Sequence, residues 1–368
     1  MLSMVPTPLR QLPWGLLLLV IAIGSFGLVI LYSAGGGMHP WALNQGLRFI
    51  FFIFVSVAIS RIDQDFLKKT AWPLYGGLLL LLIAVELFGF VGGGSRRWLN
   101  LGILTLQPSE LMKLAIILAI ARFYDLLPAG ETRSFSAMWP AAVLVLVPAF
   151  LVAIQPDLGT ALMIIGGGLI VTFLAGLPLW LFIGGGAAIA ALAPFAFFFL
   201  LHDYQRNRVL IFLTPESDPL GRGYHISQSK IAIGSGGVFG KGFLNGTQSH
   251  LDYLPERHTD FVFATMAEEW GLIGGLFIIV SFMLIINWGM RVAFNAPSRF
   301  AKLTAAGLST TIFFYVAINL AMVMGLAPVV GIPLPLVSNG GSAMMTVMIC
   351  LGLLMAIDRW TRFPKRGF

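Results

Sequence analysis

Four ionisable side chains, Glu256, Arg257, His258 and Asp260, stand directly before a long apolar segment in an otherwise very apolar chain. A carboxylate at such a boundary can act as a general base, because it can accept the proton of an attacking hydroxyl group. The alternative is structural: Thr259 and Asp260 would cap the following helix, where a side-chain oxygen accepts an orphan backbone N–H. The local sequence by itself favours the cap.

The composition is that of a polytopic membrane protein. The chain is 58% hydrophobic and 11% charged, with a mean hydropathy of +0.88, whereas a globular domain carries about 25% charged residues. The net charge of +7 is expected to orient helices and to meet membrane lipids with anionic headgroups, which argues against nucleic acid as a partner. The single cysteine, Cys350, lies in an apolar run, so the chain has no internal disulfide.

A membrane-spanning helix needs about 20 mostly apolar residues, and the sequence contains ten candidate segments. They lie near 13–33, 46–60, 73–91, 108–124, 138–155, 158–176, 178–201, 266–290, 301–325 and 342–358. The first is expected to act as signal and anchor together. We therefore expect an all-α polytopic membrane protein, a single membrane domain over 1–368, with about ten transmembrane helices. A large extracytoplasmic loop, 202–260, would join the seventh helix to the eighth.

Lys and Arg residues in the short connections predict the orientation. One face would carry Arg10, Arg61, Lys68, Lys69, Arg122, Arg133, Arg291, Arg299, Lys302, Arg359, Arg362, Lys365 and Arg366. The opposite face would carry Arg48, Arg96, Arg97 and Lys113. Cytoplasmic loops are enriched in Lys and Arg, so both termini are expected in the cytoplasm and the long loop outside.

Several polar groups near the predicted spans need an explanation. Glu110 and Lys113 open the fourth span three residues apart, on one helix face. They form either an ion pair that makes insertion tolerable or the polar floor of an outward-facing cavity. Asp157 follows Pro156 between the fifth and sixth spans, where it is expected to cap a helix. Glu86 lies within the third span, where a neutral or snorkelling side chain near the helix end would be tolerated.

The long loop combines basic side chains with glycine-rich backbone. Its cations include Arg206, Arg208, Arg222, Lys230 and Lys241, and glycines cluster over 234–242. Such a combination suits a diphosphate, although a solvated loop with ordinary surface charge has the same composition. Residues 226–233 are apolar and include a lysine, which predicts a short helix on the membrane surface.

The segment 327–342 is too short and too rich in proline to cross a bilayer, and too apolar for an aqueous loop. Irregular backbone at membrane depth is tolerated only where protein or a wet cavity covers it. We therefore expect a re-entrant segment before the last helix, beside Asp260. Metal-ligand spacing, a Ser/His/Asp set and a phosphate loop are all missing from the sequence.

The chain resembles the shape, elongation, division and sporulation proteins, the bacterial cell-wall polymerases typified by RodA and FtsW. Four stretches carry this resemblance: RRW at 96–98 with QPSELMK at 107–113, QPDLGT at 155–160, LPERHTDF at 254–261 with Glu268 and Glu269, and GIPLPLVS at 331–338. The loop sequence SKIAIGSGG at 229–237, with GTQS at 246–249, is more similar to the RodA branch. Relatives commonly have a tyrosine where this chain has Asn339.

The resemblance implies a peptidoglycan glycosyltransferase that polymerises lipid II into β-1,4-linked glycan strands during cell elongation. It also implies a partner, a class B penicillin-binding protein that crosslinks the strands. The family's catalytic carboxylate corresponds to Asp260, so the resemblance favours the general base over the simple cap. Lipid II and the growing strand would be held by a set of substrate-binding residues: Glu110, Lys113, Arg206, Arg208, Lys230 and His258.

No cofactor is evident, and the expected chemistry leaves room for a divalent cation that offsets charge on the diphosphate. Two other functions fit the same features. A flippase would move lipid II across the membrane without forming bonds, and a scaffold of the elongation machinery would not need a carboxylate.

Overall fold

A computed structural model describes residues 10–92, 95–100, 105–128, 130–200, 203–214, 222–251, 253–254 and 256–363. Helices occupy all ten predicted spans: α2 (Trp14–Ala34), α3 (Leu43–Ile59), α4 (Gln64–Phe88), α5 (Pro108–Leu126), α6 (Phe135–Ile154), α7 (Leu158–Leu174), α8 (Leu179–Phe195), α12 (Val262–Asn295), α13 (Arg299–Val323) and α14 (Gly341–Arg362). Short π-helical segments, η2 (Met38–Ala42) and η4 (Ala196–Leu200), flank α3 and α8. The predicted all-α membrane fold is confirmed.

Eight of these helices, with those flanking π-helical residues counted, are long and apolar enough to cross a membrane. The apolar helix α7 is shorter, at 17 residues. Helix α5 carries four charged side chains, Glu110, Lys113, Arg122 and Asp125, which lowers its hydropathy. The number of ten crossings therefore stays a prediction.

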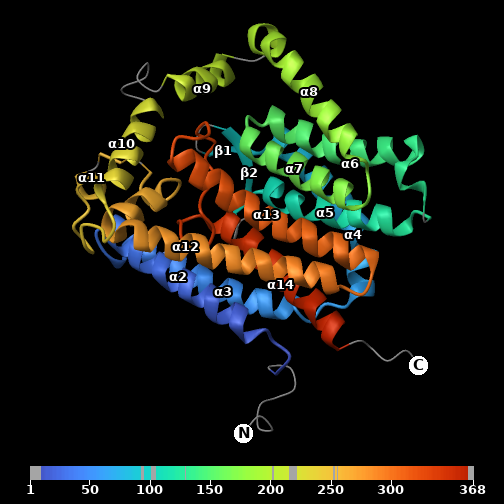
Figure 1. Cartoon of the computed structure of the whole chain (residues 1–368), viewed down its shortest axis with the longest axis horizontal. Coiled ribbons are helices and arrows are strands. Elements are labelled where there is room, and N and C mark those ends of the chain that lie inside the picture. The colour runs from blue at the N-terminus through green and yellow to red at the C-terminus, as the bar shows by residue number, and fades with distance from the viewer. Residues whose placement is uncertain are drawn as a thin grey trace.

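Three helices form the centre of the molecule: α5, α13 and α14 (Figure 1). Most residues of α5 are buried. In the most apolar stretches of α13 and α14, 67% and 78% of the residues are buried. Helix α8 is the opposite case, because it lies at the edge in Figure 1 and none of its described side chains is buried. Because the central helices are buried on most of their faces, other helices surround them rather than lipid.

A small antiparallel sheet, which the sequence did not predict, connects α4 to α5. Its strands are β1 (Phe90–Gly92), β2 (Ser95–Asn100) and β3 (Thr105–Leu106), in the order β1-β2-β3. Leu99 lies opposite Leu106 in the register. The third span was expected over 73–91, but α4 ends at Phe88 because the chain turns into this sheet.

Helix α12 is broken at Gly271, where the backbone has φ +62° and ψ −156°. The break leaves backbone groups without helical partners, and the loop before α12 supplies them. Lys241 N donates to Glu268 O at 3.0 Å, and Leu272 N donates to Gly237 O at 2.9 Å. Only glycine adopts a positive φ of this kind without strain. Gly271 therefore fixes the place where the loop residues bond to the broken backbone of the helix.

The long loop contains three helices, α9 (Asp203–Leu213), α10 (Arg222–Ser235) and α11 (Thr247–His250). Helix α10 confirms the predicted short helix, and its place on the membrane surface stays a prediction. Ile226 and Ala232 are buried, and Ser229 Oγ donates to Val323 O at 2.7 Å. The apolar face of α10 therefore packs on α12 and α13.

The predicted irregular segment follows α13 and extends to α14. Ile332, Leu334, Leu336 and Val337 are buried there. Gly27 of α2 contacts it so closely that a Cβ atom at that glycine would lie 2.7 Å from Val337 Cα. Protein covers this backbone, as expected for a re-entrant segment.

Candidate active site

Asp260 lies in the turn that leads into α12, beside the irregular segment. One side chain of α13 connects the two: Asn319 Nδ2 donates to Asp260 O at 3.0 Å and to Ile332 O at 2.7 Å. A Cβ atom added to Gly331 would lie 3.5 Å from Asp260 Oδ2. Two separate motifs of the sequence, 254–261 and 331–338, therefore contribute to one site, and Asn319 of α13 connects them.

The prediction that Thr259 and Asp260 cap the next helix is wrong. Helix α12 begins at Val262, its N-cap residue is Phe261, and no side chain caps it. Thr259 Oγ1 donates instead to Glu256 Oε2 at 2.7 Å. A local hydrogen bond of this kind competes with capping, and it leaves the carboxylate of Asp260 outside the helix terminus.

The carboxylate of Asp260 has the properties of a general base. Burial, together with the negative charge of Glu256, raises its pKa to about 6. Within the described parts of the chain, this side chain makes no hydrogen bond or ion pair. A base works best when its pKa lies near the operating pH, so at pH 7 Asp260 would be mostly ionised and still able to take a proton.

His258, a predicted substrate-binding residue, is held next to Asp260. Its ring stacks on Trp41, with centroids 4.0 Å apart and planes inclined by 21°. His258 O accepts a hydrogen bond from Asn339 N at 2.9 Å. Burial lowers the pKa of His258, and Arg257 acts in the same direction against Glu256, so the imidazole is expected to be neutral at pH 7.

Arg48 is a residue that the sequence interpretation counted only as a charge. It lies in α3, its side chain is exposed, and Arg48 Nη1 donates to Asn339 Oδ1 at 3.2 Å. Asn339, the departure from the usual tyrosine, thus links Arg48 to the backbone of His258. A cation within a short apolar span was the only sequence signal for this contact.

Among the predicted cations whose side chains the structure describes, Lys230 has the most available charge. It is exposed on α10, and its Nζ would lie 2.8 Å from a Cβ atom placed on Gly325, just before the irregular segment. Among the residues described, its ammonium group makes no hydrogen bond or ion pair. Lys230 is therefore free to meet a ligand.

Arg206 and Arg208 lie on α9, farther along the loop. Arg206 Nη2 donates to Phe198 O at 2.7 Å, which attaches this residue to the segment after α8. Helix α9 packs on α10 and lies outside the central helices in Figure 1. The side chains of Arg208, Arg96 and Arg222, and residue Pro255, lie outside the part of the chain that the structure describes.

Glu110 and Lys113 form the predicted ion pair, which is buried. Lys113 Nζ lies 2.6 Å from Glu110 Oε1 and donates to Tyr315 Oη at 2.6 Å. The Tyr315 hydroxyl also bonds to Glu110 Oε2, and Thr346 Oγ1 donates to the same oxygen at 3.0 Å. Glu110 and Lys113 are 7% and 3% exposed, so the charges are compensated inside the helix bundle.

This ion pair and Asp260 contact neighbouring turns of α13. Tyr315 contacts the pair and Asn319 holds Asp260, and residues four apart share one helix face about one turn apart. The structure thus supports an ion pair that makes burial tolerable. It also places Tyr315, which contacts the pair, about 6 Å along the helix from Asn319, which contacts Asp260.

The cap predicted for Asp157 is confirmed. Thr160 N donates to Asp157 Oδ1 at 3.2 Å, and Arg97 Nη1 lies 3.8 Å from Asp157 Oδ2. Arg97 also donates to Pro156 O at 2.6 Å. The small sheet and the turn between α6 and α7 are therefore fixed to each other.

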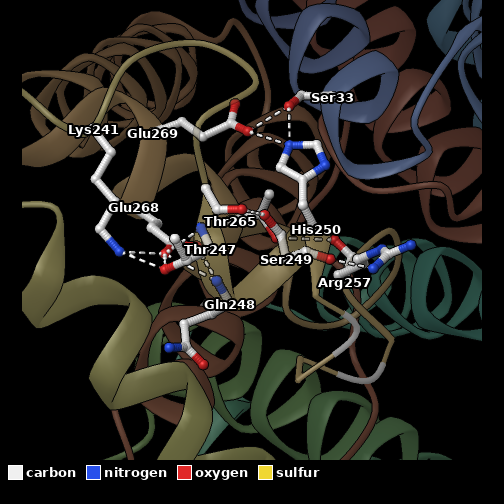
Figure 2. Close-up of polar contacts among 11 residues, drawn as sticks. Ser33, Lys241, Thr247, Gln248, Ser249, His250, Arg257, Thr265, Glu268 and Glu269 are labelled. Carbon is white, nitrogen blue, oxygen red and sulfur yellow. Dashed lines mark hydrogen bonds and ion pairs between the residues drawn. The ribbon is translucent and has the colours of Figure 1, made fainter.

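Two adjacent carboxylates in α12 hold the loop that leads to Asp260, and in Figure 2 they point away from each other. Glu268 Oε1 accepts from Lys241 Nζ at 2.7 Å and from the backbone N–H groups of Thr247 and Gln248 at 2.9 and 3.1 Å. Glu269 bonds to Ser33 of α2 and lies 3.3 Å from His250 Nε2. Both carboxylates are buried, and they position the loop rather than face a substrate.

Several known proteins are similar to this chain over most of its length. The peptidoglycan glycosyltransferase MrdB of Escherichia coli strain K12 is 45% identical over 348 residues, which cover 93% of this chain and 92% of that protein. The probable peptidoglycan glycosyltransferase FtsW of Trichlorobacter lovleyi is 36% identical over 373 residues, 97% of this chain and 96% of its own. The higher identity to MrdB agrees with the predicted RodA branch.

Solved structures give the same result. One similar chain belongs to a structure described as "Structural coordination of polymerization and crosslinking by a peptidoglycan synthase complex". It has a TM-score of 0.83 and 34% identity, and the match covers 96% of this chain and 99% of that one. The crystal structure of the rod shape determining protein RodA of Thermus thermophilus has a TM-score of 0.72 and 30% identity. The match covers 95% of this chain and 97% of that one.

The family of cell cycle proteins that comprises FtsW, RodA and SpoVE matches residues 11–363. Its members named above agree with the predicted enzyme class, and the apolar helices agree with a multi-pass protein of the inner membrane. Four motifs that are distant in the sequence stand in one fold shared with RodA, and on this basis the chain belongs to the FtsW, RodA and SpoVE family.

Proposed function

We propose that the protein is a peptidoglycan glycosyltransferase that polymerises lipid II into β-1,4-linked glycan strands during cell elongation. The observation that carries this proposal is the carboxylate of Asp260. It lies beside the irregular segment, has a pKa of about 6, and makes no hydrogen bond or ion pair within the described chain. A structural carboxylate would have a partner, as Glu268 does.

In the proposed step, Asp260 accepts the proton from the sugar 4-hydroxyl of the acceptor lipid II. The hydroxyl oxygen forms a bond to the anomeric carbon of the growing strand, and the bond from that carbon to the diphosphate breaks. The electron pair leaves with undecaprenyl diphosphate, and inversion converts the α-linked donor into a β-1,4 bond. A divalent cation, if the reaction uses one, would arrive with the diphosphate as part of the substrate.

Arg48 and Lys230 are the cations that we propose for the diphosphate. Lys113 is occupied by Glu110 and Tyr315, and Arg206 is attached to Phe198, whereas Arg48 and Lys230 lie beside the irregular segment with their charges exposed. Charge-assisted hydrogen bonds contribute about 1.5–3 kcal/mol. Arg48→Gln or Lys230→Gln should therefore weaken lipid II binding by about tenfold or more.

This binding is best measured in an Asp260→Asn background, so that no substrate is consumed. Lys69→Gln is the matched control, because Lys69 is an exposed lysine at the start of α4, on the other side of the predicted membrane. Equal affinity of both variants and the control would contradict the assignment of Arg48 and Lys230.

The pH dependence of polymerisation should follow Asp260. The raised pKa means that the base form is lost as the pH falls through about 6, so kcat/KM should drop about tenfold per pH unit below that value. Glu256→Gln removes the negative charge that raises this pKa and should shift the acid limb to lower pH. Glu131→Gln, at an exposed carboxylate on the opposite predicted face, should leave it unchanged. An acid limb that Glu256→Gln does not move would contradict Asp260 as the titrating group.

We also propose that both termini are cytoplasmic, which puts Asp260 on the outer face. In intact cells a cysteine at Leu251, an exposed residue of the long loop, should react with a membrane-impermeant maleimide. A cysteine at Phe363 should react only after the cells are opened. Cys350 is buried, so its background labelling should be low. Labelling of Phe363→Cys in intact cells would reverse the orientation.

The proposed partner is a class B penicillin-binding protein, which would crosslink the strands as they leave this site. The synthase complex that contains a similar chain supports this pairing. Purified lipid II supplied with the partner tests the function: a polymerase yields glycan strands from lipid II on one side of a bilayer. A flippase yields labelled lipid II in the opposite leaflet without strands, and a scaffold yields neither. Either of the last two results would overturn the proposal.

A further inference from the structure

Two adjoining cavities lie where α2 begins and where α12 and α14 end. The first has a volume of about 370 Å³ and is largely apolar, with Trp14, Leu19 and Leu284 in its lining. The second has a volume of about 330 Å³ and is lined by Arg291, Asp358 and other residues. Trp288 and Arg362 line both. The pair therefore offers an apolar compartment that continues into a charged one.

The charged compartment has ligand-binding groups that the protein leaves unused. Within the described residues, the guanidinium group of Arg291 makes no hydrogen bond or ion pair. Arg362 Nε donates to Asp358 Oδ1 at 3.0 Å, but Asp358 Oδ2 is buried without a hydrogen-bond partner. Two arginines and one aspartate give a net charge of +1. Leaving a buried acceptor unpaired is unfavourable by about 1–3 kcal/mol. Asp358 lines the compartment, and a small rotation of its side chain would present this oxygen to a donor from outside the chain.

We propose that these cavities bind one anionic phospholipid of the leaflet next to the chain termini. The phosphate lies between Arg291 and Arg362, a hydroxyl of the headgroup donates to Asp358 Oδ2, and an acyl chain follows Trp288 toward Leu284 and Leu19. Basic pockets between transmembrane helices bind anionic headgroups, and tryptophan is enriched at the level of the headgroups. A headgroup with one net negative charge and free hydroxyls, such as phosphatidylglycerol, matches the net charge and the unpaired acceptor together.

This site is separate from the proposed chemistry. Arg291 and Asp358 lie near the C-terminal ends of α12 and α14, whereas Asp260 lies before the N-terminal end of α12. Between its break at Gly271 and its end at Asn295, that helix is about 36 Å long. The lipid would hold the ends of α2, α12 and α14 together without touching lipid II.

Fluorescence quenching in nanodiscs tests the proposal with the full chain. The probe is brominated phosphatidylglycerol or brominated phosphatidylcholine in a phosphatidylcholine bilayer, and the emission of Trp288 is the difference between wild type and Trp288→Phe. Half-quenching of Trp288 should need at least fivefold less phosphatidylglycerol than phosphatidylcholine. Arg291→Gln should reduce this preference about fivefold. Lys302→Gln removes an exposed cation at the same end of the bundle and should leave the preference intact.

Equal quenching by both probes, or a preference that survives Arg291→Gln, would show that the cavity accepts any lipid and would overturn the proposal. Stronger quenching of Trp288 by brominated phosphatidylethanolamine than by brominated phosphatidylglycerol would contradict the assignment of an anionic lipid, which rests on the net charge of the site. Arg291 is exposed, so its variant should fold, and an unchanged melting temperature in detergent checks this. A rise in that temperature with inorganic phosphate alone, equal to the rise with phosphatidylglycerol, would identify a phosphate site rather than a lipid site.

Discussion

Asp260→Asn is expected to lower the rate of glycan polymerisation by about 10²–10⁴-fold, the usual contribution of a general base. The amide has nearly the same size as the carboxyl group but cannot accept the proton of the attacking hydroxyl. The native side chain makes no hydrogen bond or ion pair in the described structure, so the substitution breaks no structural contact. The protein should therefore fold and bind its partner normally, and lipid II binding should change little.

The measurement is the initial rate of strand formation from purified lipid II, with the partner present, for wild type and variant at pH 7. Glu256→Gln is a matched control, since it changes a carboxylate four residues away that is exposed and interacts with Thr259. The control should retain most of the activity at this pH. A variant that polymerises at the wild-type rate would show that the base lies elsewhere.

The helices were predictable because the membrane limits the alternatives. Backbone groups in lipid must bond within the segment, so a long apolar run such as that of α2 indicates a helix regardless of its tertiary neighbours. The end of α4 was not predictable in this way. The sheet that follows it has strands of three, six and two residues, which are too short to leave a clear alternation in the sequence.

The eighth span was expected to start at 266, whereas α12 begins at Val262. Its first turns contain two adjacent buried carboxylates, Glu268 and Glu269, which are unfavourable in a span unless they are compensated. The groups that compensate them are distant in the sequence. Lys241 and the amides near Thr247 bind Glu268, and Ser33 of α2 binds Glu269. Such partners become visible only once the loop has folded onto the helix.

The site itself was predicted in part. The residues around Asp260 indicated a carboxylate at a membrane boundary, and the resemblance to a family favoured the base over the cap. The absence of a cap depends on one hydrogen bond from Thr259 to Glu256, which competes with capping and is not readable from residue types. The contact between Arg48 and Asn339 joins α3 to the irregular segment across 291 positions, so the sequence could not indicate it.

Breaking the buried ion pair of α5 is expected to have the largest effect on stability. Glu110→Gln leaves Lys113 charged and Lys113→Met leaves Glu110 charged, in surroundings where both are almost fully buried. Removing one partner of a buried pair is unfavourable by about 3–5 kcal/mol. Each single variant should therefore unfold at a clearly lower temperature in detergent, whereas the double variant Glu110→Gln/Lys113→Met should regain more than half of the loss, because neither charge remains uncompensated.

The same series separates the two interpretations of this pair. If it only makes burial tolerable, the double variant should recover polymerisation together with stability. If Lys113 or Glu110 also forms the floor of the substrate site, the double variant should be stable and still inactive. Additive losses in the melting temperature would contradict coupling through the network of Tyr315 and Thr346, since residues that share partners are not expected to act independently.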